Sequence, residues 1–128
     1  MIEFYFWLNA IIYFIFAIWC TFKRKNTAVA SGYLQLNNSG WSEYLVIYGG
    51  LQIGLGLIFA YMALNTIFYK IGLVFAVLLY IPIVLYRVIT IFKFRSVKRL
   101  TLVIGFMEIL LLGGAIILLT VLSNINNA

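Results

Sequence analysis

The chain has no histidine, one cysteine and one proline, and only 9% of its 128 residues are charged. Soluble globular proteins carry about a quarter charged residues, so the composition excludes an ordinary soluble domain. Without histidine, and with Cys20 as the single thiol, the sequence contains no metal-ligand cluster, no CxxC pair and no Ser-His-Asp arrangement. We therefore expect no metal, no cofactor and no catalytic residues, which favours a non-enzymatic protein.

What the chain has in abundance is apolar sequence. Hydrophobic residues make up 66% of it and the mean hydropathy is +1.12. Crossing a bilayer takes about 20 apolar residues, and four runs have that length, at residues 4–22, 44–64, 71–92 and 100–122. They leave no room for a second domain. We predict one all-α domain over residues 1–128, an integral membrane four-helix antiparallel bundle, with a long loop at residues 23–42 and a kink in the third helix at Pro82.

The basic residues predict the orientation of these helices. One group follows the first span and another fills the third connection, whereas the second connection holds only Lys70; the two groups are Lys23, Arg24 and Lys25, and Lys93, Arg95, Lys98 and Arg99. The positive-inside rule places loops 23–42 and 93–99 in the cytoplasm and both termini outside, in a cytoplasmic (inner) membrane. This topology also accounts for the net charge of +6. We expect membrane lipids as partners and no nucleic acid.

Glycines on the second helix indicate close helix packing. At about 100° per residue, Gly49 and Gly56 lie on one side of the helix, and the small-xxx-small pair of Gly50 and Gly54 lies nearly opposite. We therefore expect this helix to pack between two neighbours. The third and fourth helices carry small residues on faces that also bear polar side chains. The predicted packing positions are Gly49, Gly50, Gly54, Gly56, Gly72 and Gly105.

Two charges lie deep in apolar runs, Arg87 in the third span and Glu108 in the fourth. Each costs about 2.5 to 3.5 kcal/mol at a helix centre, so such residues usually pair or line a pathway. With about 1.5 Å rise per residue, Arg87 is about 9 Å from its basic helix end, Glu108 about 12 Å, and Gln52 of the second helix about 13 Å. We predict one polar layer of Gln52, Arg87 and Glu108, joined by Tyr13 or Tyr48.

This layer has two interpretations. In the first, it is an ion pair that locks the third helix to the fourth, with Gln52 satisfying the leftover donors. In the second, it is a site for a headgroup, an anion, a proton or a small molecule that opens toward the cytoplasm. Residues 33–36 and Trp41 of the long loop could cover the mouth of such a site, or could form a plain interfacial loop.

Tyrosine depth divides the remaining aromatic residues into two sets. The deeper tyrosines, which are the ones that could hydrogen-bond inside the bundle, are Tyr13, Tyr48, Tyr80 and Tyr86. Tyr5 and Tyr44 lie near span ends, where interfacial anchoring is sufficient to explain them. Asn9 of the first span is predicted to lie nearer the outside than the polar layer.

The run from Tyr48 to Gly56, with a lone Arg87 and a lone Glu108, resembles the small bacterial membrane proteins of domain-of-unknown-function family 4345, which are more distantly similar to DoxX-like four-helix proteins. The resemblance covers nearly the whole chain. It implies a four-helix bundle and no established activity. The chain departs from the family pattern at Leu45, where an arginine is expected, and at Gln52, where an acid is expected.

Three classes of function fit the sequence. The one we favour is a non-enzymatic membrane protein that binds a lipid, a quinone or another amphiphile, or that assembles with a second copy or a membrane partner through its glycines. The second is a proton-coupled or small-solute transporter, for which four helices would need to dimerise. The third is an intramembrane isomerase-type enzyme that uses Glu108 as a general acid or base.

Overall fold

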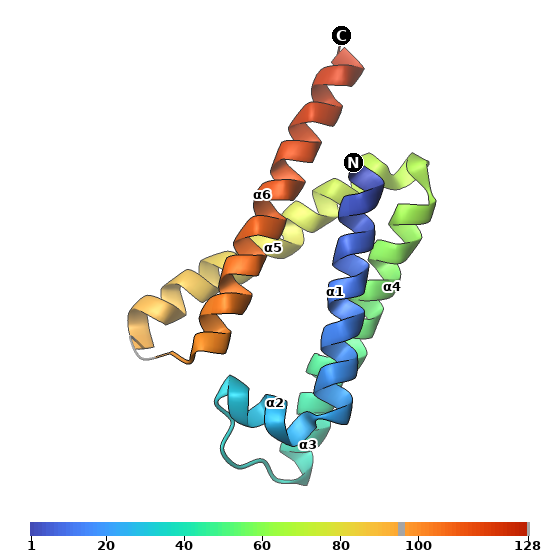
Figure 1. Cartoon of the computed structure of the whole chain (residues 1–128). Coiled ribbons are helices and arrows are strands. Elements are labelled where there is room, and N and C mark those ends of the chain that lie inside the picture. The colour runs from blue at the N-terminus through green and yellow to red at the C-terminus, as the bar shows by residue number, and fades with distance from the viewer. Residues whose placement is uncertain (95–96, 128) are drawn as a thin grey trace.

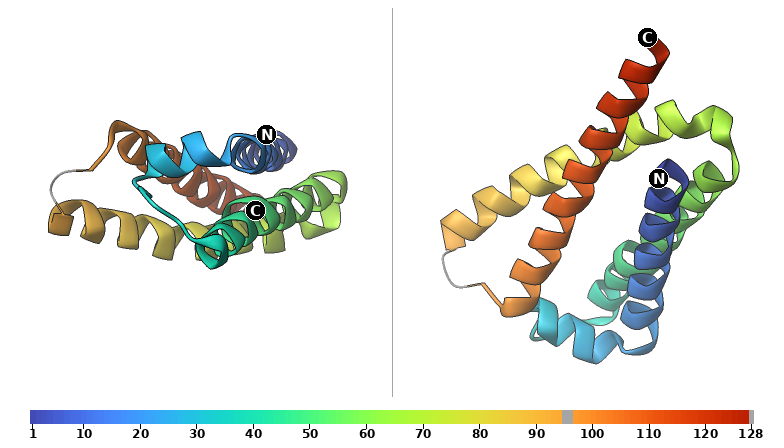
Figure 2. Two further views of the ribbon diagram at one scale, coloured as in Figure 1. Left: turned by 90° about the horizontal axis from the view of Figure 1, so that it is seen from below. Right: turned by 45° about the horizontal axis from the view of Figure 1, so that its top comes forward.

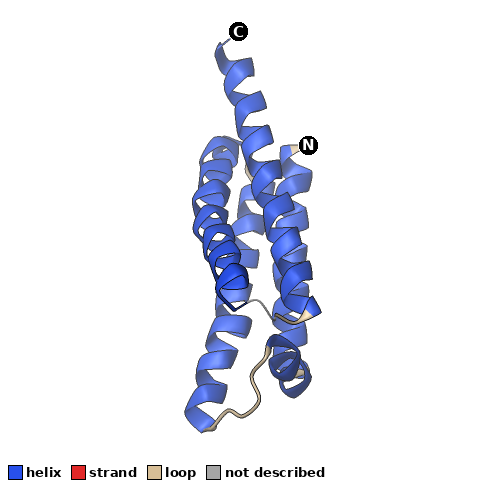
Figure 3. Cartoon of the chain, turned by 90° about the vertical axis from the view of Figure 1, so that its left-hand side faces the viewer, coloured by secondary structure: helices blue, strands red, loops and turns tan. Residues whose placement is uncertain are grey.

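The structure, a computed structural model, describes residues 1–94 and 97–127, with side chains as far as residue 125, so the predicted basic residue Arg95 lies outside it. All elements within these residues are helical, and Figure 3 shows that only short loops join them. The elements are α1 (Ile2–Phe22), α2 (Arg24–Ser31), α3 (Asn38–Leu45), the π-helix η1 (Val46–Gly50), α4 (Leu51–Leu64), the 3-10 helix η2 (Thr66–Phe68), α5 (Tyr69–Phe94) and α6 (Arg99–Asn127).

Four helical stretches in the described part of the chain are long and apolar enough to cross a membrane. They are Ile2–Phe22, Asn38–Leu64, Thr66–Phe94 and Arg99–Ile125. Each contains one predicted span, so the prediction of an all-α membrane protein with four spanning helices is confirmed. Large apolar side chains also cover the outside of these helices, as Phe4, Leu57 and Phe92 do at 71%, 58% and 76% exposure, and a hydrocarbon layer would cover such a surface.

The four long helices form two antiparallel pairs. α1 packs mainly along α4, and α5 packs mainly along α6. In Figure 1 the two pairs approach each other near the chain termini and diverge toward the opposite end, where α2 lies. We call this second end the basic end, because Lys23, Arg24, Lys25, Lys93, Lys98 and Arg99 are in the segments that meet there.

The main core lies where the two pairs meet. Phe6 of α1, Phe59 of α4 and Leu73 of α5 are each fully buried, and Ala76 and Ala115 bring α5 and α6 close to them. Helix association in lipid depends on such van der Waals packing, because hydrocarbon is as apolar as the side chains themselves. This core therefore joins the pairs near the termini, and α2 contacts α6 at the basic end.

The predicted loop at residues 23–42 is largely helical, so that part of the prediction is wrong. Gly32 ends α2 at φ 102°, a left-handed conformation that suits glycine, and Asn37 caps α3 by accepting a hydrogen bond from the Gly40 amide at 2.8 Å. Between α2 and α3 only residues 32–37 are non-helical, and Figure 2 shows this segment crossing the basic end of the bundle. The glycine and asparagine that suggested a loop are helix-ending and helix-starting residues.

α2 is held against its neighbours by a small second core. Thr27 and Ala28 of α2 are 1% and 2% exposed, and Cys20 of α1 is buried beside them. The hydroxyl of Tyr44 donates to Thr27 Oγ1 at 2.8 Å. Tyr44 was expected to be an interfacial anchor, but it is 4% exposed because α2 folds back over it. α2 is therefore a docked part of the structure.

α5 remains helical on both sides of Pro82, so the ring does not interrupt the helix. Pro82 is exposed, as are Ile81 and Leu85 nearby. The missing amide of a proline and its clash with the preceding turn are tolerated best where nothing else must pack tightly against the helix. A bend at Pro82 stays a prediction.

The predicted packing glycines divide into two groups. An added Cβ would lie 3.0 Å from Thr21 at Gly49, 2.9 Å from the Phe14 ring at Gly56, 2.7 Å from the Phe6 ring at Gly72 and 3.1 Å from Arg87 at Gly105. An added Cβ at Gly50 or Gly54 would meet nothing within 4 Å. Within the described chain α4 lies mainly against α1 and also contacts α5, through Phe59 and Phe75, but the close approach predicted for the face of Gly50 and Gly54 is wrong.

Substituting alanine for Gly72 and for Gly54 separates these two groups. Gly72→Ala should lower the stability by about 1 to 3 kcal/mol, because its Cβ would overlap the fully buried Phe6 ring. Gly54→Ala should leave the stability unchanged or raise it slightly, because alanine favours the helix by about 1 kcal/mol. Thermal unfolding in detergent measures both, and equal losses for the two variants would contradict the packing described above.

Candidate functional site

A cavity of about 360 Å³ lies between the α1/α4 pair and the α5/α6 pair, toward the basic end. All four long helices line it, and Ser31 and Tyr33 border it from α2 and the segment that follows. Its walls are mainly apolar. All five residues of the predicted polar layer line this one cavity: Tyr13, Tyr48, Gln52, Arg87 and Glu108.

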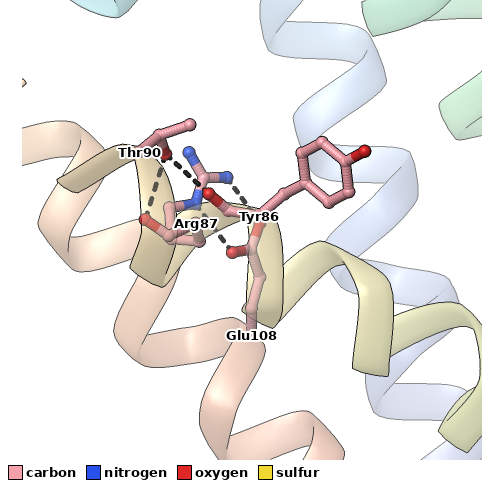
Figure 4. A network of polar contacts seen from close by, with 4 residues as sticks. All are labelled: Tyr86, Arg87, Thr90 and Glu108. Carbon is pink, nitrogen blue, oxygen red and sulfur yellow. Dashed lines mark hydrogen bonds and ion pairs between the residues drawn. The ribbon is translucent and has the colours of Figure 1, made fainter. Parts of the chain in front are cut away.

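Arg87 and Glu108 form a two-point ion pair between α5 and α6. Arg87 Nε donates to Glu108 Oε2 at 2.9 Å, and Nη2 donates to Oε1 at 2.7 Å. Figure 4 shows the two side chains facing each other, while the Tyr86 ring points away. The side chains are 28% and 14% exposed, so the pair is partly buried at the cavity wall. Such fork geometry is the strongest form of a charge-assisted hydrogen bond.

Two neighbouring residues make room for this pair. Gly105 lies against the aliphatic part of Arg87, where an added Cβ would be 3.1 Å from Cγ. The Thr90 hydroxyl lies 2.8 Å from the Tyr86 carbonyl oxygen and 3.0 Å from that of Arg87, and its one proton is shared between these two acceptors (Figure 4). The hydroxyl of Thr90 therefore hydrogen-bonds within its own helix, and it does not compete with Glu108 for the guanidinium of Arg87.

Gln52 does not take the role predicted for it. Its Nε2 donates to the carbonyl of Ile47 at 3.3 Å, and among the described residues no hydrogen bond joins it to Arg87 or Glu108. The π-helix η1 precedes it, and such wider turns occur frequently at functional sites. Gln52 thus lines the same cavity as the ion pair but lies on the opposite helix pair, which diverges at this level.

Aromatic side chains surround the basic end of the cavity. The hydroxyls of Tyr33 and Tyr48 are 3.1 Å apart. The centroid of the Tyr48 ring lies 4.7 Å from the centroid of the Tyr44 ring. It lies 6.4 Å from the centroid of the Phe16 ring, which it meets edge to face. Tyr33 therefore borders the cavity at this end. The other residues predicted to cover it line a separate surface hollow: Leu34, Gln35, Leu36 and Trp41.

A second polar network closes the other end of the cavity. The Tyr80 hydroxyl donates to Asn9 Oδ1 at 2.6 Å, Asn9 Nδ2 donates to the carbonyl of Tyr5 at 2.7 Å, and the Tyr5 hydroxyl donates to the carbonyl of Leu111 at 2.9 Å. These bonds connect α1, α5 and α6, and Asn9 is fully buried. Tyr80 bonds inside the bundle as predicted. The interfacial prediction for Tyr5 is wrong, because its side chain is 6% exposed.

Sequence reasoning missed the importance of Asn9. A lone amide in an apolar span is the same signal that identified Gln52, since such a group needs a partner within the protein. Tyr13 lines the cavity with its ring stacked on Phe59, at 5.7 Å between centroids and an angle of 8°. Tyr86 was expected to bond inside the bundle, but its side chain is 73% exposed, so that prediction is wrong.

The chemistry available in this cavity is polar recognition. Among the residues that the structure describes, Arg87 and Glu108 are the only charged ones that line it, and no three His, Cys, Asp or Glu side chains of that part of the chain gather as a metal site. Hydrogen-bond donors and acceptors project from a mainly apolar wall, as they do in most small-molecule sites. Such sites have volumes of about 300 to 1,000 Å³. The cavity is at the lower end of that range.

Comparisons with protein-family models, with curated proteins and with solved structures found no match to this chain. The resemblance to family 4345 therefore stays a prediction. The site has to be interpreted from its own geometry.

The ion pair can be tested by a double-mutant cycle. Arg87→Leu alone should lower thermal stability in detergent by about 3 to 5 kcal/mol, because it leaves the Glu108 carboxylate partly buried without a partner. Arg87→Leu combined with Glu108→Leu should lower it less, since no lone charge remains. If the double variant lost the sum of the two single losses, the two residues would not be energetic partners.

Proposed function

We propose that the chain is a non-enzymatic membrane protein that binds an amphiphile, with the polar head of the ligand against Arg87 and Glu108 and its tail along the apolar walls. The observation that carries this proposal is the lining of the cavity. Leu79, Ile83 and Met107 provide apolar surface beside the one ion pair. An amphiphile has that same combination of surfaces.

The alternative functions receive less support from the geometry. A transporter needs a path to both sides of the membrane, but the cavity ends against the Tyr80–Asn9 network and the fully buried Phe6 and Phe59. An enzyme that uses Glu108 as a base needs a carboxylate free to take a proton. Both of its oxygens accept hydrogen bonds from Arg87, so the carboxylate is held in place and its acceptor atoms are already engaged.

The proposal includes an orientation with the basic end in the cytoplasm and both termini outside. Its support is that the basic segments lie at one end and both chain termini at the other (Figure 1), an asymmetry that the positive-inside rule relates to topology. The cavity would then lie in the cytoplasmic half of the membrane. Tyr33 would border it at the cytoplasmic end.

Labelling of single cysteines tests this orientation. In a Cys20→Ala background, Ser39→Cys at the basic end and Asn124→Cys near the C-terminus should behave oppositely with a membrane-impermeant maleimide. In intact cells we expect labelling at position 124 only, and at both positions after the membrane is opened. Labelling of position 39 in intact cells would reverse the proposed orientation.

Filling the cavity tests the binding function. Ile83→Trp places a larger side chain in the cavity, and Leu85→Trp is a matched control because Leu85 is 56% exposed on the same helix. Mass spectrometry of protein purified from native membranes should find about one amphiphile per chain for wild type and the control. Ile83→Trp should reduce it at least tenfold, equivalent to about 1.4 kcal/mol.

Circular dichroism should show the same helix content in all three proteins, so that loss of the ligand is not loss of the fold. Equal amphiphile in the two tryptophan variants would contradict a site in this cavity. A wild-type protein that carries no amphiphile in excess of bulk lipid would contradict it as well.

A further inference from the structure

The described lining of the cavity has no net charge, and this restricts its ligand. Among residues 1–94 and 97–125, the charged residues that line it are Arg87 and Glu108, one of each sign. Because Glu108 already neutralises Arg87, an anionic head beside this pair would bring an uncompensated negative charge into a partly buried, mainly apolar site, which is unfavourable. A head without charge avoids this cost.

The ion pair does not use all the N–H donors of Arg87. A guanidinium carries five N–H groups and no acceptor. Nε and Nη2 of Arg87 are directed at Glu108, and Nη1 donates to no other residue in the described part of the chain. A ligand therefore completes the site by supplying an acceptor, such as a carbonyl oxygen.

Aromatic side chains form part of the cavity wall. Tyr13, Phe16, Tyr33, Tyr48 and Tyr80 all line the cavity, from α1, the segment after α2, η1 and α5. Aromatic rings associate with one another by offset stacking and by edge-to-face contact, at centroid separations of about 4.5 to 7 Å. A planar ring can use both contacts, whereas a flexible glycerol-based head can use neither.

We infer that the ligand of this cavity is a quinone-type amphiphile, with an uncharged planar ring that bears carbonyl oxygens and a hydrocarbon tail. This inference rests on the proposed function. One ring carbonyl accepts from Nη1 of Arg87, the ring lies among the tyrosines, and the tail follows Leu79, Ile83 and Ile104. The inference concerns binding alone and requires no redox step.

Native mass spectrometry in detergent tests this choice of ligand. The purified chain is titrated separately with a fully substituted decyl-benzoquinone, with dioleoyl phosphatidylglycerol and with dioleoyl phosphatidylethanolamine. We expect one benzoquinone per chain, and at least tenfold weaker binding for Arg87→Lys, which keeps the charge but loses the fork and Nη1. Tyr86→Phe, an exposed neighbour of Arg87, should bind as wild type does.

Ile83→Trp serves as a second variant, because it fills the cavity without altering the ion pair and so remains informative if Arg87→Lys does not fold. It should abolish benzoquinone binding. If either phospholipid binds with the same dependence on Arg87 and Ile83 and the benzoquinone does not, the amphiphile site stands and the quinone inference is overturned. If no probe depends on these residues, both proposals fail.

Discussion

Polar side chains inside apolar helices need partners within the protein, because a hydrocarbon layer supplies none. Several contacts among the described residues meet this need by joining different helices: Arg87 with Glu108 joins α5 to α6, Tyr80 with Asn9 joins α5 to α1, Tyr5 with the Leu111 carbonyl joins α1 to α6, and Tyr44 with Thr27 joins α3 to α2. Apolar contact alone gives membrane helices little preference for one neighbour over another. These polar contacts therefore specify which helices meet and at what level.

The divergence of the two helix pairs converts one of these contacts into a candidate site. The core of Phe6, Phe59 and Leu73 joins the pairs near the termini, and toward the basic end the pairs separate. The Arg87–Glu108 pair lies at the level of this separation, so it lines a cavity instead of a filled core. The side chains of Arg87 and Glu108 therefore hold α5 to α6, and the same atoms could contact the polar head of a ligand.

Hydropathy and residue depth along each helix were sufficient to predict the spans and one pair of charged partners. The four spans follow from hydropathy, and the Arg87–Glu108 partnership follows from two rare charges at similar depth. Depth alone could not assign a partner to Gln52, which bonds to Ile47 on its own helix. It also could not tell which glycine face of α4 has a neighbour, because Gly50 and Gly54 have the same spacing as a packed pair yet face open space.

By itself, the sequence determined that this protein is an all-α membrane protein with four spanning helices and one internal ion pair. Those properties depend on the apolar run lengths and on the cost of an unpaired charge, which act along a single segment. Only the tertiary structure decided that α2 and Tyr33 lie at the basic end, that Asn9 and Tyr80 close the opposite end, and that a cavity lies between them. Those properties depend on the rotation and divergence of the helices, which are set by contacts between distant residues.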